Sequence, residues 1–460
     1  MRLDELLDGV DVLELRGDAA VDVRSVTHDS AQVTLGALFC CVPGTHVDGH
    51  DFADQAVAAG AVALLVERAL PLDVSQVRVA DVRAAMGPVA AAAYGHPSRW
   101  LTVVGVTGTN GKTTTTHFLR GIFEANGWAS GTIGTLDGAR TTPEAPVLQA
   151  TLASMRDNGQ RAAAVEVSSH ALAQRRVDGV HFAAVVFTNL SQDHLDYHGT
   201  MEDYFAAKAT LFDPHRADVA IVNADDPYGR RLLEDPALRT VPYSRADATG
   251  VTTAADRARF TWRGVEVQLA VGGEFNIDNA LAAATTAAEL GIDPEVIARG
   301  VEDVTIPGRY EAVHAGQPFP VIVDYAHTPD GLEQLLLAAR RDVRGGRLFV
   351  VFGAGGDRDA GKRPQMGAVA ARLADVAILT SDNPRHEDPL DIIGQVQAGA
   401  PSGELLVEPD RRSAIASALR DACDGDVVVI AGKGHEQGQD FGDRVVPFDD
   451  RDVAREVLSA

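Results

Sequence analysis

The chain has 460 residues, a length that predicts about three domains. Its 41 basic and 65 acidic residues give a formal net charge of −24, which argues against a general nucleic-acid or anionic-membrane surface. A local basic pocket for phosphates stays compatible with that charge. No apolar run approaches the roughly 18 residues of a membrane span, and the first residues lack a secretory pattern, so we expect a cytoplasmic protein without membrane insertion.

The chain carries three cysteines, Cys40, Cys41 and Cys423. Neighbouring cysteines rarely pair with each other, so a disulfide framework is not expected and a reducing compartment fits. We expect all three to be buried as small apolar residues.

Apolar runs early in the chain predict a small α/β unit. Strands are expected at Ala37–Val42 and Ala61–Val66, with a helix over Phe52–Ala59 between them. The segment His96-Pro97-Ser98-Arg99-Trp100 has the composition of a linker. A first domain is therefore predicted over residues 1–97.

Beyond this linker, predicted strands alternate with helical patterns, which indicates mainly parallel sheets. The strands are expected at 101–106, 162–167, 183–188 and 219–223, then at 320–324, 347–353, 376–380 and 427–431. The turn Ile306-Pro307-Gly308 separates the two series. The predicted fold class is α/β, with a central P-loop domain at 98–307 and a Rossmann-like domain at 308–460.

The segment Gly108-Thr109-Asn110-Gly111-Lys112-Thr113 directly follows an expected strand and precedes a helical pattern over Thr114–Ala125. In such a loop, backbone N–H groups and the helix N-terminus face a phosphate, Lys112 reaches its terminal oxygens and the Thr113 hydroxyl can bind Mg²⁺. The strict P-loop pattern is missed because Val106 stands where the first glycine belongs. The alternative is a glycine turn that only begins a helix.

Two further strand ends carry polar side chains that suit a metal or substrate. Glu166 ends one strand, and its carboxylate can bind Mg²⁺, although Ser168 or Ser169 could simply cap a helix beside it. Asp193 and His194 follow the next strand and could position Mg²⁺, water or substrate. Because strands in a parallel sheet end at one edge, these groups are expected near the phosphate loop.

Lys208 lies among apolar neighbours on an expected helix. From the residues alone, the favoured interpretation is a lysine whose stem packs while its head reaches water. The other interpretation is a buried neutral amine, because burial lowers the pKa of lysine.

Three strand ends near the carboxyl terminus supply Arg358, Arg385 and Glu436. Guanidinium groups bind carboxylates through paired hydrogen bonds, and a carboxylate binds an ammonium group. Together they would fit an amino-acid-like ligand. The alternative is a set of surface ion pairs.

Over nearly its whole length the chain resembles the Mur ligase family of peptidoglycan synthesis. The matching segments are 108–113, 165–172, 188–194, 204–212, 324–329, 356–364 and 432–436. The phosphate loop and the 188–194 stretch are shared with folylpolyglutamate ligases. Residues 166–172 together with Asp382-Asn383-Pro384-Arg385 resemble the Mur ligases that add meso-diaminopimelate.

This resemblance implies an ATP-dependent ligase of peptidoglycan precursor synthesis. It would join meso-diaminopimelate to UDP-N-acetylmuramoyl-L-alanyl-D-glutamate (UDP-MurNAc-L-Ala-D-Glu) through an acyl phosphate, with Mg²⁺ as cofactor and ATP as a substrate. A monomer is expected, with the first domain binding the UDP-sugar, the second ATP and the third the amino acid.

The resemblance also implies roles for individual residues. Catalytic roles fall on Lys112, Glu166, His194 and Lys208, and metal contacts on Thr113, Glu166, His194 and a carbamylated Lys208. ATP contacts fall on Gly108, Thr109, Asn110, Gly111, Lys112, Thr113, Thr114, Asn276, Asn279, Arg309 and Asp324. UDP-sugar-peptide contacts fall on Ser30, His46, Thr141, Thr142, Ser168, Gln174 and Arg176. Diaminopimelate contacts fall on Arg358, Asp382, Asn383, Pro384, Arg385, Gly432 and Glu436.

The chain departs from the family pattern at three places: Ala31 and Val147 stand where an arginine and an aspartate are common, and Arg309-Tyr310-Glu311-Ala312 replaces Arg-Met-Glu-Arg. These changes affect nucleotide-sugar affinity and packing more than the reaction. Three alternatives remain: a folylpolyglutamate-type ligase, a catalytically silent scaffold that binds UDP-sugar-peptides, and a P-loop switch or motor ATPase.

Overall fold

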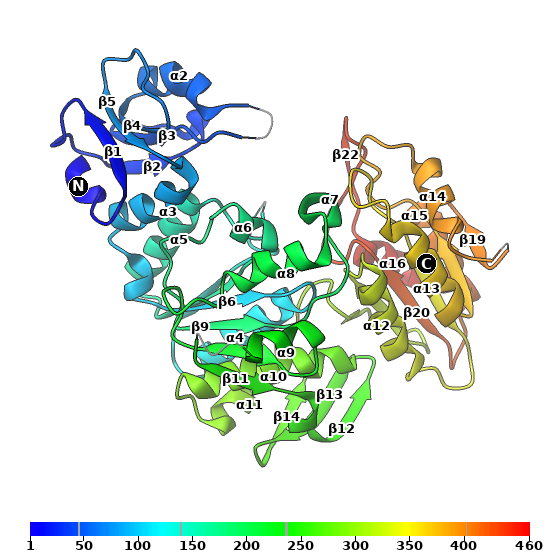
Figure 1. Cartoon of the computed structure of the whole chain (residues 1–460). Helices are drawn as coiled ribbons and strands as arrows, with labels where there is room; N and C mark the ends of the chain where they lie inside the picture. The colour runs from blue at the N-terminus through cyan, green and yellow to red at the C-terminus, as the bar shows by residue number, and fades with distance from the viewer. Residues whose placement is uncertain (45–46, 139, 235–237, 402) are drawn as a thin grey trace.

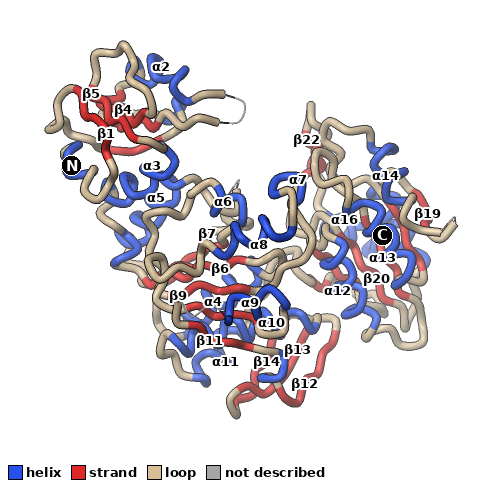
Figure 2. Tube along the Cα trace, viewed as in Figure 1, coloured by secondary structure: helices blue, strands red, loops and turns tan. Residues whose placement is uncertain are grey.

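The computed structural model describes residues 1–44, 47–138, 140–234, 238–401 and 403–460. Figure 1 shows three groups of elements that follow one another along the chain, and the two termini lie in the first and the last group. Each group contains a main sheet formed from one continuous stretch of sequence. In Figure 2 the strands lie inside each group and the helices cover them, which confirms the predicted α/β class.

The first sheet has the strand order β1-β5-β4-β3-β2. Its strands pair in parallel, except that β1 runs antiparallel to β5. The strands are β1 Val12–Arg16, β2 Ser25–Thr27, β3 Ala37–Cys40, β4 Ala61–Val66 and β5 Ser75–Val79. The helices are α1 Leu3–Leu6, α2 Ala53–Ala58 and α3 Val82–Ala93, with short 3₁₀ turns at Ser30–Gln32, Gly49–Phe52 and Pro97–Arg99.

The central sheet has the order β11-β10-β9-β6-β8-β7, and all its pairs are parallel. Its strands are β6 Thr102–Thr107, β7 Ser130–Ile133, β8 Ala162–Glu166, β9 Ala184–Phe187, β10 Ala220–Asn223 and β11 Thr240–Tyr243. Because the strands are parallel, the segments that follow β6, β8 and β9 lie at one edge of the sheet.

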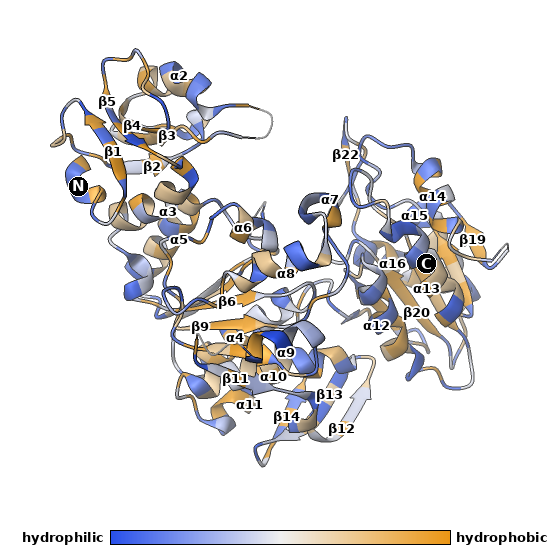
Figure 3. Cartoon of the chain, in the orientation of Figure 1, coloured by the Kyte–Doolittle hydropathy of each residue, from blue (hydrophilic) through white to orange (hydrophobic). Residues whose placement is uncertain are grey.

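Helices cover both faces of the central sheet. They are α4 Lys112–Ala125, α5 Ala145–Asp157, α6 Ser169–Ala173, α7 Leu195–His198, α8 Met201–Ala209, α9 Pro227–Glu234, α10 Glu274–Glu289 and α11 Pro294–Glu302. On one face Val104 and Val106 pack with α4, α10 and α11, and on the other Val103 packs with α5 and α8. The alternation follows from the two-residue period of a strand. Figure 3 shows these strands as mostly hydrophobic.

A small antiparallel sheet packs below α10 and was not among the predicted elements (Figure 1). Its strands are β12 Thr249–Ala254, β13 Arg257–Trp262 and β14 Val265–Leu269, with a short 3₁₀ turn at Arg245–Asp247 before them. Phe260 and Trp262 are buried against the helices, whereas Arg257 and Arg259 on the alternate positions of β13 are exposed. The sheet therefore extends the core on the α10 face.

The third sheet has the order β15-β16-β20-β17-β18-β19 and is parallel except for β15. Its strands are β15 Glu311–Ala312, β16 Val321–Asp324, β17 Leu348–Phe352, β18 Val376–Leu379, β19 Leu405–Val407 and β20 Val427–Ala431. The helices are α12 Pro329–Arg340, α13 Lys362–Leu373, α14 Pro389–Gln397, α15 Arg411–Asp421 and α16 Asp450–Ser459. A hairpin of β21 Gly438–Asp440 and β22 Val445–Pro447 follows β20.

The predicted burial of the cysteines is wrong in one case. Cys40 and Cys41 are buried as expected, but Cys423 is exposed. Cys423 lies in the turn between α15 and β20, where its N–H donates to the Asp426 carboxylate at 2.8 Å and the side chain is left at the surface. Within the described residues, no helix is both long and apolar enough to cross a membrane.

Helices α4 and α11 approach each other closely through two glycines, Gly121 and Gly300. A Cβ atom on Gly121 would collide with the carbonyl oxygen of Gly300, and one on Gly300 would collide with the backbone of Ile122. Because α4 begins at the phosphate loop, this contact supports the loop from behind.

We predict that Gly121→Ala lowers the free energy of unfolding by about 1–3 kcal/mol, because the added methyl group must separate two packed helices. Urea unfolding would measure the change. Gly394→Ala on α14 is the matched control, since a Cβ there meets nothing within 4 Å and removes the cost of a helical glycine. Equal effects at the two positions would contradict the packing argument.

Candidate active site

A cavity of about 440 Å³ lies between the central and the third sheet. Its walls are loops at the carboxyl ends of strands from both sheets, as open parallel sheets generally arrange their binding sites. Most of the predicted site residues line it: Thr109, Asn110, Gly111, Lys112, Thr113, Thr114, Thr141, Glu166, Ser168, His194, Asn279, Arg309, Asp324, Arg358, Asp382, Asn383, Arg385, Gly432 and Glu436.

The phosphate loop after β6 is held in shape by two glycines. Gly108 has φ 149° and Gly111 has φ 84°, and a Cβ would collide with Thr188 Oγ1 at the first position and with Asn279 Oδ1 at the second. The Lys112 ammonium donates to the carbonyl oxygens of Gly108 at 2.9 Å and Thr109 at 2.8 Å. Burial lowers the pKa of Lys112. The loop therefore keeps its cation folded back beside the space where a phosphate would bind.

Glu166 ends β8 as a buried carboxylate beside this loop. Its Oε2 accepts from the Thr113 hydroxyl at 3.0 Å, and its Oε1 accepts from the Thr135 N–H at 2.8 Å. No lysine or arginine among the described residues forms an ion pair with it within 4.0 Å. A carboxylate and a hydroxyl are the hard oxygen ligands that Mg²⁺ prefers, so this pair fits a magnesium ion that also binds a phosphate. Within the described ranges, no cluster of three or more His, Cys, Asp or Glu side chains could hold a metal ion.

Ser168 caps a helix, as the alternative interpretation of this segment predicted. Its hydroxyl accepts from the Ala171 N–H at 3.2 Å and caps α6. Helix capping by Ser168 and metal binding by Glu166 are therefore compatible.

The Lys208 side chain does not reach water, which corrects the interpretation favoured from the residues alone. Only 1% of Lys208 is exposed, because α8 packs this face against the phosphate loop. Its ammonium donates to the Gly108 carbonyl at 2.9 Å and lies 4.6 Å from the centre of the Tyr204 ring. Burial, with the nearby Lys112 cation, lowers the pKa of Lys208 well below its usual value. The buried amine is therefore disposed to be neutral.

His194 precedes α7 in a left-handed conformation with φ 56°. Its ring lies edge-on to the His170 ring, with centres 4.8 Å apart. Burial and the nearby His170 and Lys112 lower the pKa of His194, so its imidazole is neutral near pH 7 and free to bind a metal.

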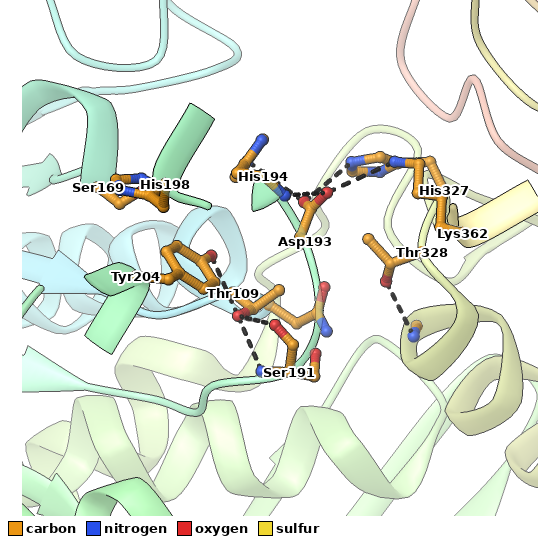
Figure 4. Close-up of polar contacts among 12 residues, drawn as sticks. Thr109, Ser169, Ser191, Asp193, His194, His198, Tyr204, His327, Thr328 and Lys362 are labelled. Carbon is orange, nitrogen blue, oxygen red and sulfur yellow. Dashed lines mark hydrogen bonds and ion pairs between the residues drawn. The ribbon is translucent and has the colours of Figure 1, made fainter. Parts of the chain in front are cut away.

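Asp193 joins the two sides of the cavity (Figure 4). Its carboxylate, 4% exposed, lies 3.5 Å from Lys362 Nζ, 3.9 Å from His327 Nε2 and 3.2 Å from His194 Nε2. Lys362 begins α13 and His327 follows β16, so both come from the third sheet. The nearby cation of Lys362 holds the pKa of Asp193 low, against the effect of burial.

Two further contacts connect the phosphate loop with the third group of elements. Asn110 Nδ2 donates to Asp330 Oδ2 at 3.0 Å, and Arg309 Nη2 donates to Thr113 Oγ1 at 3.3 Å. Asp324 accepts from the N–H groups of Tyr310 and Ala326, each at 2.7 Å, and so shapes the segment that carries Arg309.

On the opposite wall, the three expected strand ends converge. Arg385 Nη1 donates to the Gly356 carbonyl at 2.6 Å, and Asn383 Nδ2 donates to Glu436 Oε2 at 2.7 Å. Arg358 is exposed at the same cavity. Pro384 is buried and does not line the cavity, but its neighbours do.

The remaining predicted residues in the described ranges do not line the cavity. Gly108 belongs to the phosphate loop. Asn276 supports Asn279, whose Nδ2 donates to Asn276 Oδ1 at 3.1 Å. Arg176 Nη1 donates to the Thr142 carbonyl at 3.1 Å, and Arg176 Nη2 to Gln174 Oε1. Ser30 lies apart on the first group of elements, and His46 lies outside the described residues.

Sequence profiles of one family match most of the chain. The Mur ligase middle domain matches residues 106–287, the glutamate ligase domain of Mur ligases matches 308–434, and the catalytic domain of the Mur ligase family matches 22–94. The chain belongs to the Mur ligase family. The predicted family and ligase class are thereby confirmed.

Individual Mur ligases resemble this one over their full length. A protein of Streptomyces coelicolor named UDP-N-acetylmuramoyl-L-alanyl-D-glutamate–2,6-diaminopimelate ligase is 45% identical over 99% of this chain and 96% of its own. A solved structure with the same protein name is 32% identical, covers 100% of this chain and 98% of its own, and has a TM-score of 0.70. The MurF ligase of Thermotoga maritima, solved with ADP, is 20% identical over 95% and 96% of the two chains, with a TM-score of 0.66, and shares the fold.

Sequence reasoning gave no role to several residues at the site of this Mur ligase. Three of them lie inside the segments that match the family: Lys362, His327 and Lys433. Their spacing in the sequence does not indicate which side chains they contact. Thr135 and Asp330 gave no signal. Each acquires its meaning from a contact across a long sequence separation, such as the 169 residues between Asp193 and Lys362.

We predict that Asp193→Asn lowers the free energy of unfolding by about 3 kcal/mol, because it leaves the buried Lys362 ammonium without its charged partner. Urea unfolding of Asp193→Asn, Lys362→Met and the double variant would measure it. Since the two side chains interact, the double variant should lose about 0.5–3 kcal/mol less than the sum of the single variants. The exposed Asp196→Asn is the control, and additive losses would contradict the pairing.

Proposed function

We propose that this Mur ligase joins meso-diaminopimelate to the D-glutamate side-chain carboxylate of UDP-MurNAc-L-Ala-D-Glu, with ATP as the energy source and Mg²⁺ as cofactor. The observation that carries the proposal is that one cavity has a phosphate loop on one wall and the Arg385, Asn383 and Glu436 side chains on the other. The names of the full-length relatives support the choice of substrates.

The proposal divides the chain into three functional parts. Residues 1–97 would bind the UDP-sugar, with Ser30 and His46 toward the uridine, and residues 98–307 would bind ATP. Residues 308–460 would bind the amino acid. The sugar-peptide would lie along Thr141, Thr142, Ser168, Gln174 and Arg176, between the first part and the cavity.

Ligation needs an activated carboxylate, because a free carboxylate is a poor acyl donor. The glutamate carboxylate oxygen attacks the γ-phosphorus of ATP, ADP leaves, and an acyl phosphate forms. The amine of diaminopimelate then attacks the acyl carbon, loses a proton, and expels inorganic phosphate from a tetrahedral intermediate. Phosphoryl transfer of this kind depends mainly on positioning and charge neutralisation.

The side chains of the phosphate loop fit the first of these steps. The Lys112 ammonium lies where it can turn from two loop carbonyls toward the phosphates. Thr113 and Glu166 would hold Mg²⁺, which when bound neutralises phosphate charge. Arg309, already bonded to Thr113, lies where it can approach the same phosphates.

We further propose that Lys208 carries a carbamate. Its buried amine is disposed to be neutral, and only a neutral amine can add to CO₂. The addition forms an N–C bond, releases one proton from the amine nitrogen, and converts the neutral side chain into an anion. Together with His194, that anion would supply ligands for a second Mg²⁺.

We predict that Lys208→Ala abolishes most ligation and that a short-chain carboxylic acid partly restores it, because the acid supplies the missing anion. Phosphate release would be measured across a range of added acid. The exposed Arg372→Ala on α13 serves as a control and should keep full activity. Full activity of Lys208→Ala without added acid would refute the carbamate.

We predict that Arg385→Ala mainly harms the use of diaminopimelate, because a carboxylate of this substrate loses its paired hydrogen bonds. The expected loss in kcat/KM is about 1.5–3 kcal/mol, or roughly 10- to 150-fold. KM and kcat would be measured for each substrate in turn. Unchanged constants for diaminopimelate would exclude this role for Arg385.

The proposal as a whole is tested by phosphate release with ATP, Mg²⁺ and UDP-MurNAc-L-Ala-D-Glu, with diaminopimelate, lysine and ornithine as separate acceptors. Turnover with diaminopimelate alone is the expected result. Turnover with lysine alone would retain the ligase and overturn the acceptor assignment. Turnover of ATP without any acceptor would instead favour a P-loop switch, and silence with every acceptor a scaffold or a folate-type ligase.

A further inference from the structure

Lys433 is the most deeply buried cation near the proposed acceptor site. It follows β20, between Gly432 and Gly434, and none of it is exposed. Its ammonium donates to Asn383 Oδ1 at 2.9 Å, to Glu436 Oε2 at 2.9 Å and to the Gly438 carbonyl at 2.6 Å. An ammonium group has three donors, so all are in use. Lys433 does not line the cavity, although both of its side-chain partners do.

These contacts leave the two oxygens of Glu436 in different situations. Oε2 accepts from Lys433 Nζ and from Asn383 Nδ2, the latter at 2.7 Å. No group of the described residues donates to Oε1, and the Glu436 side chain is 28% exposed at the cavity. A carboxylate tethered through one oxygen presents the other in a fixed direction. Oε1 is therefore the oxygen available to a bound ammonium group.

The same lysine fixes the amide of Asn383. Asn383 Oδ1 accepts from Lys433 Nζ and from the Asp440 N–H at 3.0 Å, so the oxygen must face those two donors. The amide nitrogen then faces Glu436, as observed. With Lys433 absent, the amide could rotate by half a turn and place its oxygen against the Glu436 carboxylate, which would push that carboxylate away.

We propose that Lys433 is a positioning residue that aims Glu436 Oε1 at the distal ammonium of the amino-acid acceptor. The proposal rests on the proposed function, which places the acceptor beside Arg385 and Glu436. Lys433 touches no substrate and acts through two neighbours. The Glu436 charge in turn gives the buried Lys433 ammonium a charged partner.

A pair of acceptors separates this role from a general one. Diaminopimelate has a distal ammonium group, whereas 2-aminopimelate has the same chain and carboxylates but lacks that group. We expect Lys433→Met to lower kcat/KM for diaminopimelate by about 10- to 100-fold, as for the loss of a charged hydrogen bond. Use of 2-aminopimelate should change by less than about 3-fold, so the preference between the two acceptors collapses. KM for ATP should stay unchanged.

The variants are chosen so that misfolding cannot imitate the result. Lys433→Met/Glu436→Gln removes both charges, leaves no buried ion unpaired and should fold even where the single variant does not. Because Lys433 acts through Glu436, the double variant should discriminate between the acceptors as poorly as Glu436→Gln alone. Arg420→Met, at an exposed position on α15, is the matched control and should behave as the wild type.

Several outcomes would overturn the inference. A folded Lys433→Met enzyme that keeps its preference for diaminopimelate would do so, as would equal losses with both acceptors and a raised KM for ATP. Additive effects of Lys433→Met and Glu436→Gln would also exclude action through Glu436. A wild-type enzyme that uses neither acceptor would overturn the proposed function together with this inference, whereas normal wild-type turnover with an indifferent Lys433→Met overturns the inference alone.

Discussion

The buried carboxylate of Asp193 connects the two sheets that form the cavity. It forms an ion pair with Lys362 at the start of α13 and lies close to His327 and His194. Basic side chains from both walls of the cavity therefore surround one carboxylate. Without Asp193, the buried ammonium group of Lys362 would have no charged partner in the described part of the chain. The geometry of the phosphate loop relative to the acceptor wall therefore depends on an ion pair between residues that are 169 positions apart in the sequence.

Buried lysines recur around this cavity, each with a different set of partners. Lys112 and Lys208 both donate to the Gly108 carbonyl, Lys362 faces Asp193, and Lys433 holds Asn383 and Glu436. A carboxylate partner favours the charged form of a buried lysine, whereas burial and a neighbouring cation favour the neutral form. Burial and the nearby Lys112 cation, which lower the pKa of Lys208, are the basis for the proposed carbamate on this side chain.

Glycines allow the backbone to approach these groups. At Gly108 and Gly111 the positive φ angles and the nearby Thr188 and Asn279 side chains exclude any Cβ, so the loop backbone packs closely against both neighbours. Behind the loop, Gly121 and Gly300 bring α4 against α11. Close backbone contacts therefore hold both the phosphate loop and the helix that follows it.

Local patterns in the sequence determined the α/β class, the phosphate loop, and the strands that carry the site. The predicted strands at Ala61–Val66 and 427–431 coincide with β4 and β20, because continuous apolar runs bounded by turns leave little choice of register. The antiparallel strands β12 to β14 escaped prediction, since their short alternating patterns are stable only against α10 and α11. Only the tertiary structure decided that Lys208 is buried, that Cys423 is exposed, and that Lys433 meets Asn383 and Glu436. Burial and charge pairing depend on residues distant in the chain, and no local pattern contains them.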